Sequence, residues 1–317
     1  RHESGELYVS NRFKLSDAVL LQADLNYVRL DKRYAVDDAV LFSGLQLAGG
    51  SELVDRNIRE WNPRLGLAWQ PAPGHTLRAA AQKWRRGAGV NTLAPVDTIG
   101  IALDDRLVAV GGEMKRMRAQ YEWALDAKTF LMGFADRKRV DNLANPGGTL
   151  VADFDLQDLD RLRNRNRLST QALDYWEATP EFGAAEVDSV GFAVNRLLSS
   201  TLSASLRYHR NDSRNTGAAL RGNKVPWLPR HLFSVGADWL PAARWQLGTT
   251  LTYRSERFAD EANVQRLSAG WNLGLRSYWE SGDKRWSVEA IVDNLYSNKA
   301  STTTRSPVFG LQALYRF

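Results

Sequence analysis

Large apolar side chains alternate with small or polar ones along most of this chain, with a period of two residues. In residues 305–317, Phe309, Leu311 and Tyr315 fall on one face, whereas Gln312 and Arg316 fall on the other. This period predicts β-strands with one apolar and one polar face. The same alternation recurs in residues 19–27, 61–70, 116–125, 202–209, 233–239, 245–254, 271–276 and 286–293. After a turn, Phe130, Met132 and Phe134 are expected to continue the apolar face.

Short and long connections between these strands follow one another in turn. The short ones are rich in turn-forming residues and lie at 16–17, 71–75, 126–128, 198–200, 241–243 and 281–284. The long ones lie at 31–59, 86–112, 142–182, 215–229, 258–265 and 297–304. Barrels of the bacterial outer membrane have short turns on the periplasmic side and long loops outside. The sorting therefore predicts both a fold and an orientation.

Hydropathy agrees with strands that cross a membrane. The chain is 44% hydrophobic, and its mean hydropathy is −0.40. No segment approaches the ~20 apolar residues of a transmembrane helix, whereas barrel strands need only ~9–11 alternating residues. The predicted fold is all-β, a transmembrane antiparallel up-and-down β-barrel that occupies residues 1–317 as a single domain.

The number of strands suggests that the barrel continues upstream. We count about 13 clear strands, or about 15 to 17 if hairpins near 37–58 and 148–177 are included, and bacterial single-chain barrels have even numbers. We therefore expect a strand before residue 1 and a closed barrel of about 14–18 strands, with about 16 favoured. The chain would then be the C-terminal part of a longer protein.

Tryptophan is abundant, with 11 residues in the chain. Many of these residues stand at the ends of predicted strands, where an indole ring would reach the lipid headgroups. The alternative is the core of a soluble β-sandwich. The predicted girdle at the membrane interface consists of Trp69, Trp123, Trp239, Trp245, Trp271, Trp279, Trp286 and Phe317.

Other chemistry has little support in the sequence. The chain has no Cys, and its net charge of +6 is spread out, so we expect no disulfide, thiolate metal site or nucleic-acid partner. Its four His residues lack a metal-ligand spacing, and no cofactor is expected. His209, Asn211 and Ser213 align on one strand face, as a hydrolase would require, but polar wall residues are commoner there. We predict that the chain is not an enzyme.

Several short motifs resemble a known family. Asn62 to Leu67, Leu77 to Ala80, Pro229 to His231, Asp293 to Tyr296 and the closing Tyr315-Arg316-Phe317 are similar, in this order, to the barrel of TonB-dependent outer-membrane receptors. The resemblance covers roughly residues 60–317. It implies an integral outer-membrane protein of a Gram-negative envelope, surrounded by lipid and lipopolysaccharide. It also implies that the barrel-assembly machinery recognises the C-terminal strand.

The differences from that family limit what can be inferred about transport. Those receptors have about 22 strands and a plugged lumen, whereas this chain is shorter and shows no plug-like segment. Barrels that export exopolysaccharide, with periplasmic helical repeats upstream, are a second resemblance. We expect a solute conduit, with an export pore and a blocked adhesive or phage-receptor barrel as alternatives. A periplasmic partner or an upstream domain is also expected.

Arginine is frequent at positions predicted to face the lumen. Arg161, Arg163, Arg165 and Arg167 recur with period two, and an Arg at the bilayer midplane would cost ~2–4 kcal/mol. A cationic lumen would favour an anionic solute or an acidic saccharide, although cross-strand ion pairs or binding of lipopolysaccharide phosphates are alternatives. The predicted lumen residues are Arg116, Arg118, Arg161, Arg163, Arg165, Arg167, Arg207, Arg254, Arg276 and Glu122, and Arg64, Arg78 and Arg137 are also expected to point inward.

The connection 86–112 is unusual for a solvated loop, because it contains Ile99, Ile101, Leu107 and Val108. It could fold into the lumen as a constriction, or it could pack on its neighbours at the rim. The sequence leaves both possibilities open.

Overall fold

The computed structural model describes residues 2–36, 52–86, 96–104, 107–108, 111–142, 182–293 and 308–316. These residues form strands and turns, and none of them is helical. No membrane-spanning helix is found in this part of the chain. The all-β prediction is therefore confirmed.

Long strands make up the main sheet, whose order is β1-β2-β3-β4-β7-β8-β9-β10-β11-β12-β15-β16-β17. Neighbouring strands such as β1 and β2, or β11 and β12, pair antiparallel. Two short hairpins lie outside the main sheet: β5 (Asp97–Thr98) with β6 (Ile101–Ala102), and β13 (Arg257–Phe258) with β14 (Arg266–Leu267). The bounds of the long strands are β1 His2–Lys14, β2 Val19–Val36, β3 Glu52–Ala72, β4 His75–Arg85, β7 Glu113–Asp126, β8 Thr129–Asp141, β9 Ala184–Leu197, β10 Leu202–Asn215, β11 His231–Ala242, β12 Trp245–Arg254, β15 Gly270–Glu280, β16 Trp286–Asp293 and β17 Val308–Tyr315.

The main sheet contains 13 strands within the described residues. This number agrees with the count of clear strands in the sequence. The additional hairpins expected near 37–58 and 148–177 fall mostly or wholly outside the described residues. The size of the closed barrel therefore stays a prediction.

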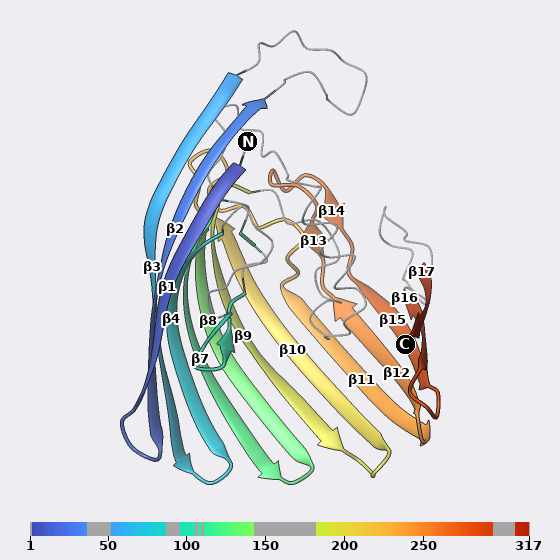
Figure 1. Ribbon diagram of the computed structural model, residues 1–317. Helices are drawn as coiled ribbons and strands as arrows, with labels where there is room; N and C mark the ends of the chain where they lie inside the picture. Colours follow the sequence, from blue (N-terminus) through green and yellow to red (C-terminus); the bar gives the residue numbers. More distant parts are fainter. Residues whose placement is uncertain are drawn as a thin grey trace. The chain divides into compact units, whose positions relative to one another are not determined.

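The chain divides into two compact units. The first comprises Arg1–Leu67, Ala80–Arg116 and Val140–Thr179, and the second comprises Ala68–Ala79, Met117–Arg139 and Pro180–Phe317. In the second unit, the short turns that join successive strands all lie at the same end of the strands (Figure 1). Strands β2 and β3 are 18 and 21 residues long, which is about twice what a bilayer crossing needs.

The two faces of the sheet differ as the alternation predicts. Between β11 and β12, Val235 lies opposite Leu251 on one face, and Ser234 lies opposite Thr252 on the other. The apolar face is exposed rather than buried, since the Leu311 side chain on β17 is 79% accessible. Such a continuous exposed apolar face is stable only when lipid covers it.

The face assignment of β8 from the sequence is wrong. Phe130, Met132 and Phe134 were expected on the apolar face, but the Phe134 ring lies 3.9 Å from the Arg118 guanidinium and makes a T-shaped contact with His209, so the even-numbered residues of β8 share the polar face. Asp136, two residues further along β8, also contacts Arg118. Residues 130–134 are all apolar or Gly, so their pattern cannot determine which side faces water.

The prediction for Arg137 is wrong for the same reason. It was expected to point inward, but its Nε atom lies 2.9 Å from Asp188 Oδ1, and both side chains are about half exposed. Arg139 makes a similar pair with Glu186 at 2.8 Å. These pairs lie on the face opposite Asp136, beyond the apolar rows formed by Val190 and Phe192.

Candidate functional site

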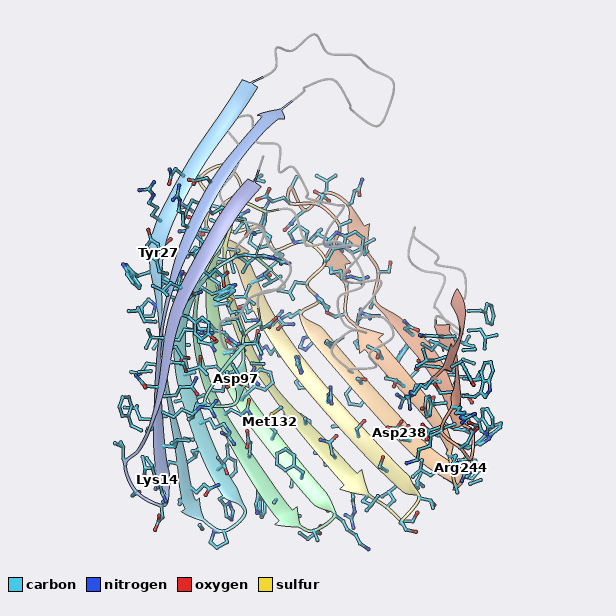
Figure 2. All side chains as sticks on the ribbon, in the orientation of Figure 1. Lys14, Tyr27, Asp97, Met132, Asp238 and Arg244 are labelled. Carbon is cyan, nitrogen blue, oxygen red and sulfur yellow. The ribbon has the colours of Figure 1, made fainter. Side chains whose placement is uncertain are left out.

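A segment of the long connection 86–112 packs on the polar face of the sheet in the first unit. Its hairpin, β5 with β6, spans residues 97–102, and the backbone N–H of Ile99 donates to Gln22 Oε1 at 2.9 Å. Arg12 on β1 lies 3.7 Å from the Asp97 carboxylate. Figure 2 shows Asp97 beside the sheet and Tyr27 projecting from the opposite side. We call residues 96–104 and 107–108 the covering segment.

Polar side chains of β4 and β7 hold the other side of this segment. Gln82 Nε2 donates to Thr98 Oγ1 at 3.1 Å and to the carbonyl of Ile101 at 3.3 Å. Arg116 donates to the carbonyl of Ala102 at 2.7 Å. Of the two arrangements that the sequence left open for this connection, the contacts correspond to the inward one.

Close packing at Gly66 makes the contact possible. An added Cβ at this position would lie 2.8 Å from Ile99 Cγ2 and 2.9 Å from Thr98 Cγ2. Any side chain larger than hydrogen would therefore push the covering segment away. Ile99, Ile101, Leu107 and Val108 of the segment are all buried, which explains why this connection is so apolar.

Beneath the segment, the polar face carries a buried ion pair. Arg64 Nε lies 3.8 Å from Asp24 Oδ2, and the two side chains are 0% and 1% exposed. Asp24 also accepts hydrogen bonds from Ser10 Oγ at 2.6 Å and from Gln22 Nε2 at 2.9 Å. The Arg64 guanidinium lies 5.7 Å from the centre of the Trp84 ring. Charge is thus balanced at this point of the wall.

Ion pairs also line the polar face of the second unit. Arg78 contacts Glu122 at 2.9 Å, Arg118 contacts Asp136 at 3.4 Å, and Arg276 contacts Asp238 at 2.8 Å. These distances correspond to the alternative in which cross-strand pairs support the wall. The excess of positive charge suggested by the sequence is therefore partly offset.

The structure places the predicted lumen residues as follows. Arg116 and Arg118 lie on the polar face of β7, and Glu122 lies there beside Arg78. Arg276 shares Asp238 with Gln246, which puts β12 residues of even number, including Arg254, on the same face. Arg207 lies on the same face of β10 as His209, and His209 contacts Phe134 on the polar face. Arg161, Arg163, Arg165 and Arg167 lie outside the described residues.

The predicted girdle residues lie at two levels of the sheet. Trp69, Trp123, Trp239, Trp245, Trp279 and Trp286 stand near the short turns; Trp245 pairs with Trp279 in the register, and Trp286 contacts Tyr315 at 4.8 Å between ring centres. Trp271 stands at the opposite end of β15, where it contacts Tyr253 and Phe233. Phe317 is outside the described residues. Tryptophan at both levels is typical of a membrane-spanning barrel.

The possible hydrolase constellation is occupied by structural contacts. The Asn211 amide bonds to Ser189 Oγ at 2.8 Å and to the carbonyl of Pro229 at 3.0 Å, and Ser213 Oγ accepts the N–H of Val225 at 3.2 Å. These bonds fix the segment 225–229 against β10. Within the described residues, no group of three or more His, Asp or Glu side chains could hold a metal ion.

Sequence reasoning missed Asn26, Asn62 and Trp84 as candidate site residues, although all three are buried on the polar face of the first unit. Asn26 and Asn62 stood in the predicted polar rows, but their burial depends on residues far away in the sequence. A signal was present in the apolar composition of 86–112, which implied a surface for this connection to cover.

Comparison with known proteins identifies a family. The family model described as TonB dependent receptor-like, beta-barrel, matches residues 1–106 and 137–295. No curated protein sequence matches the chain.

Solved receptors share the fold at low sequence identity. The siderophore receptor PiuA from Acinetobacter baumannii aligns at TM-score 0.59 and 13% identity over 99% of this chain and 43% of its own. The ferric yersiniabactin uptake receptor FyuA from Yersinia pestis aligns at 0.60 and 12%, over 100% and 46%. The FrpB iron transporter from Neisseria meningitidis aligns at 0.56 and 14%, over 100% and 44%. The chain spans less than half the length of these receptors.

Proposed function

This chain belongs to the TonB-dependent receptor-like β-barrel family and is integral to the bacterial outer membrane. We propose that it forms part of the barrel wall of an uptake receptor for a metal chelate. The family match over residues 1–106 and 137–295 is the observation that carries this proposal. The family relation favours uptake over exopolysaccharide export, and over a blocked barrel that serves only as an adhesin or phage receptor.

The polar face supports a path for a hydrated solute. In a barrel this face lines the interior, where water can solvate the ion pairs Arg78–Glu122 and Arg276–Asp238. Such pairs hold the charged side chains in place, so the wall can present charge to a solute. The proposed chelate is anionic, because Arg116, Arg207 and Arg254 also lie on this face. An acidic saccharide is the second candidate.

Uptake by whole cells tests the proposal. The full-length protein would be expressed in a strain that lacks its own iron-chelate receptors, and entry of radiolabelled ferric citrate and ferric hydroxamate would be measured with and without TonB. We expect TonB-dependent entry of at least one chelate. Entry of neither chelate, together with an increase in secreted polysaccharide, would favour the export pore; unchanged levels of both would favour the blocked barrel.

We propose lipopolysaccharide as the main contact of the charged side chains on the outer face. Arg214 and Arg139 both pair with Glu186, the latter at 2.8 Å, and Lys224 pairs with Asp212 at 2.8 Å. These cations lie beyond the apolar rows, at the ends of the strands away from the short turns, where lipid phosphates would be found. The barrel-assembly machinery, acting on β17, and an upstream or periplasmic domain remain proposed partners.

A further inference from the structure

Two side-chain amides on the polar face of the first unit are buried with unused hydrogen-bonding capacity. Asn26 on β2 and Asn62 on β3 are both 0% exposed. Neither the nitrogen nor the oxygen of either amide has a hydrogen-bond partner among the described residues, and the same is true of the Trp84 indole nitrogen. Most buried polar atoms in folded proteins are paired, so these groups call for an explanation.

The contacts around them place these residues together. The Tyr27 and Trp61 rings lie 4.9 Å apart between their centres, and Asp24 contacts Arg64 at 3.8 Å. In neighbouring antiparallel strands these two contacts set the register, which puts Asn26 beside Asn62. Trp84 is next to Arg64, on the same face.

The covering segment packs on the same polar face, close to these residues. Its hairpin lies on Gly66, two residues from Arg64, and Arg86 donates to the carbonyl of Val108 at 2.9 Å. The segment is held to the wall by polar contacts from Gln22, Gln82 and Arg116. Water in the lumen could replace each of these contacts if the segment moved away. Burial of Ile99 and Val108 favours the covered state, whereas burial of the Asn26 and Asn62 amides opposes it.

We propose that Asn26, Asn62 and Trp84 form a subsite for an uncharged, hydroxyl-bearing part of the solute, and that the covering segment must be displaced to expose it. The inference rests on the proposed uptake function and names a contact within it. A carboxamide presents both donors and an acceptor, which matches a hydroxyl group, and the indole adds a donor and a flat apolar surface. Because Asp24 balances Arg64, the subsite has no excess charge to select an anion.

Thiol labelling can detect the displacement, because residues 1–317 contain no Cys and any Cys elsewhere in the full-length protein can be replaced by Ser. Thr98→Cys places the reporter on the covering segment, where Thr98 is 0% exposed, and Val264→Cys gives an exposed reference at 79%. In lipid vesicles containing the full-length protein, we expect a water-soluble maleimide to react about tenfold or more slowly with Thr98→Cys than with Val264→Cys.

Sorbitol is the probe for the subsite, and sodium chloride at matched osmolarity is the control. We expect sorbitol to raise the labelling rate of Thr98→Cys severalfold in a saturable manner, and sodium chloride to leave it unchanged. The rise should be absent when Asn26→Ala and Asn62→Ala are added. Heat-modifiable migration on gels checks that each variant is folded, and the single Asn62→Ala variant serves if the double variant is not.

Fast labelling of Thr98→Cys without sorbitol would show that the covering segment is not held against the wall. Slow labelling that sorbitol does not change, or a rise that persists without the two Asn side chains, would overturn the subsite. Chelate uptake in cells is measured separately, so a receptor that imports a chelate and fails the sorbitol test would refute only this inference.

Discussion

Gly66 and Ile99 are in such close contact that a Cβ added at Gly66 would lie 2.8 Å from Ile99 Cγ2. Gly66 belongs to β3, and Ile99 lies in the hairpin of the covering segment. A single missing side chain on the wall thus allows a distant connection to lie flat on the polar face.

Gly66→Ala should therefore destabilise the covered arrangement. Overpacking of this kind costs about 1–3 kcal/mol in the free energy of unfolding, unless the segment moves away and the loss becomes smaller. Urea unfolding in lipid vesicles would measure it. Gly133→Ala is the matched control, since the nearest atom to its added Cβ lies 4.0 Å away. Equal stability of the two variants would show that Ile99 does not press on Gly66.

Arg64→Leu should be among the more damaging substitutions in the wall. Its partner Asp24 is 1% exposed, and removal of one member of a buried pair typically costs about 3–5 kcal/mol. Lys14→Ala breaks an exposed pair with Asp17, where the expected cost is about 0–1 kcal/mol. Unfolding midpoints of the two variants can be compared directly. A loss for Arg64→Leu as small as that for Lys14→Ala would contradict the buried pair.

Charge should be tolerated on one face of β12 and rejected on the other. Leu251 lies on the apolar face opposite Val235, and its neighbour Thr250 lies on the polar face. Leu251→Arg should cost up to about 2–4 kcal/mol in lipid, with the largest value at the midplane, whereas Thr250→Arg should cost much less. Folding yield into vesicles and urea unfolding report the difference. The reverse order would show that lipid contacts the other face.

The turn that joins β15 and β16 should become less stable in acid. The hydroxyl of Ser281 and the N–H of Arg285 both donate to Asp283, which lowers the pKa of that carboxyl below its usual value of 3.8. A lowered folded pKa means that the stabilisation is complete above the usual pKa and is lost as pH falls through the folded one. The stability difference between the native protein and Asp283→Asn should therefore shrink below about pH 4. A difference that does not depend on pH would exclude ionisation of Asp283 as its cause.

Lipopolysaccharide should dissociate more readily from the double variant Arg139→Ala/Arg214→Ala. Both arginines are exposed on the outer face and share Glu186, so their loss leaves that carboxylate to repel phosphate. Lipopolysaccharide that copurifies in mild detergent, measured by phosphate content, should fall. Arg244→Ala is the control. Arg244 lies in the short turn before β12, at the opposite end of the strands from Arg139 and Arg214. An equal loss from the control would remove the outer cluster as the binding site.

The alternation of side chains could be interpreted without coordinates because a strand places successive side chains on opposite faces whatever it pairs with. Pairs such as Val235 with Leu251 and Ser234 with Thr252 follow from it directly. The same reasoning fails at Phe134, where every neighbour from Phe130 onward is apolar or Gly, and at Arg137, whose partner Asp188 lies on the next strand.

By itself, then, the amino-acid sequence determined the all-β architecture, the two chemically different faces, the short turns and the membrane environment, because each of these depends on local periodicity. Only the tertiary structure decided that residues 96–104 lie on the polar face, that Gly66 makes room for Ile99, and that Asn26 and Asn62 are buried. Those features arise from contacts between residues far apart in the chain, and a period of two residues carries no information about what lies against a face once it is formed.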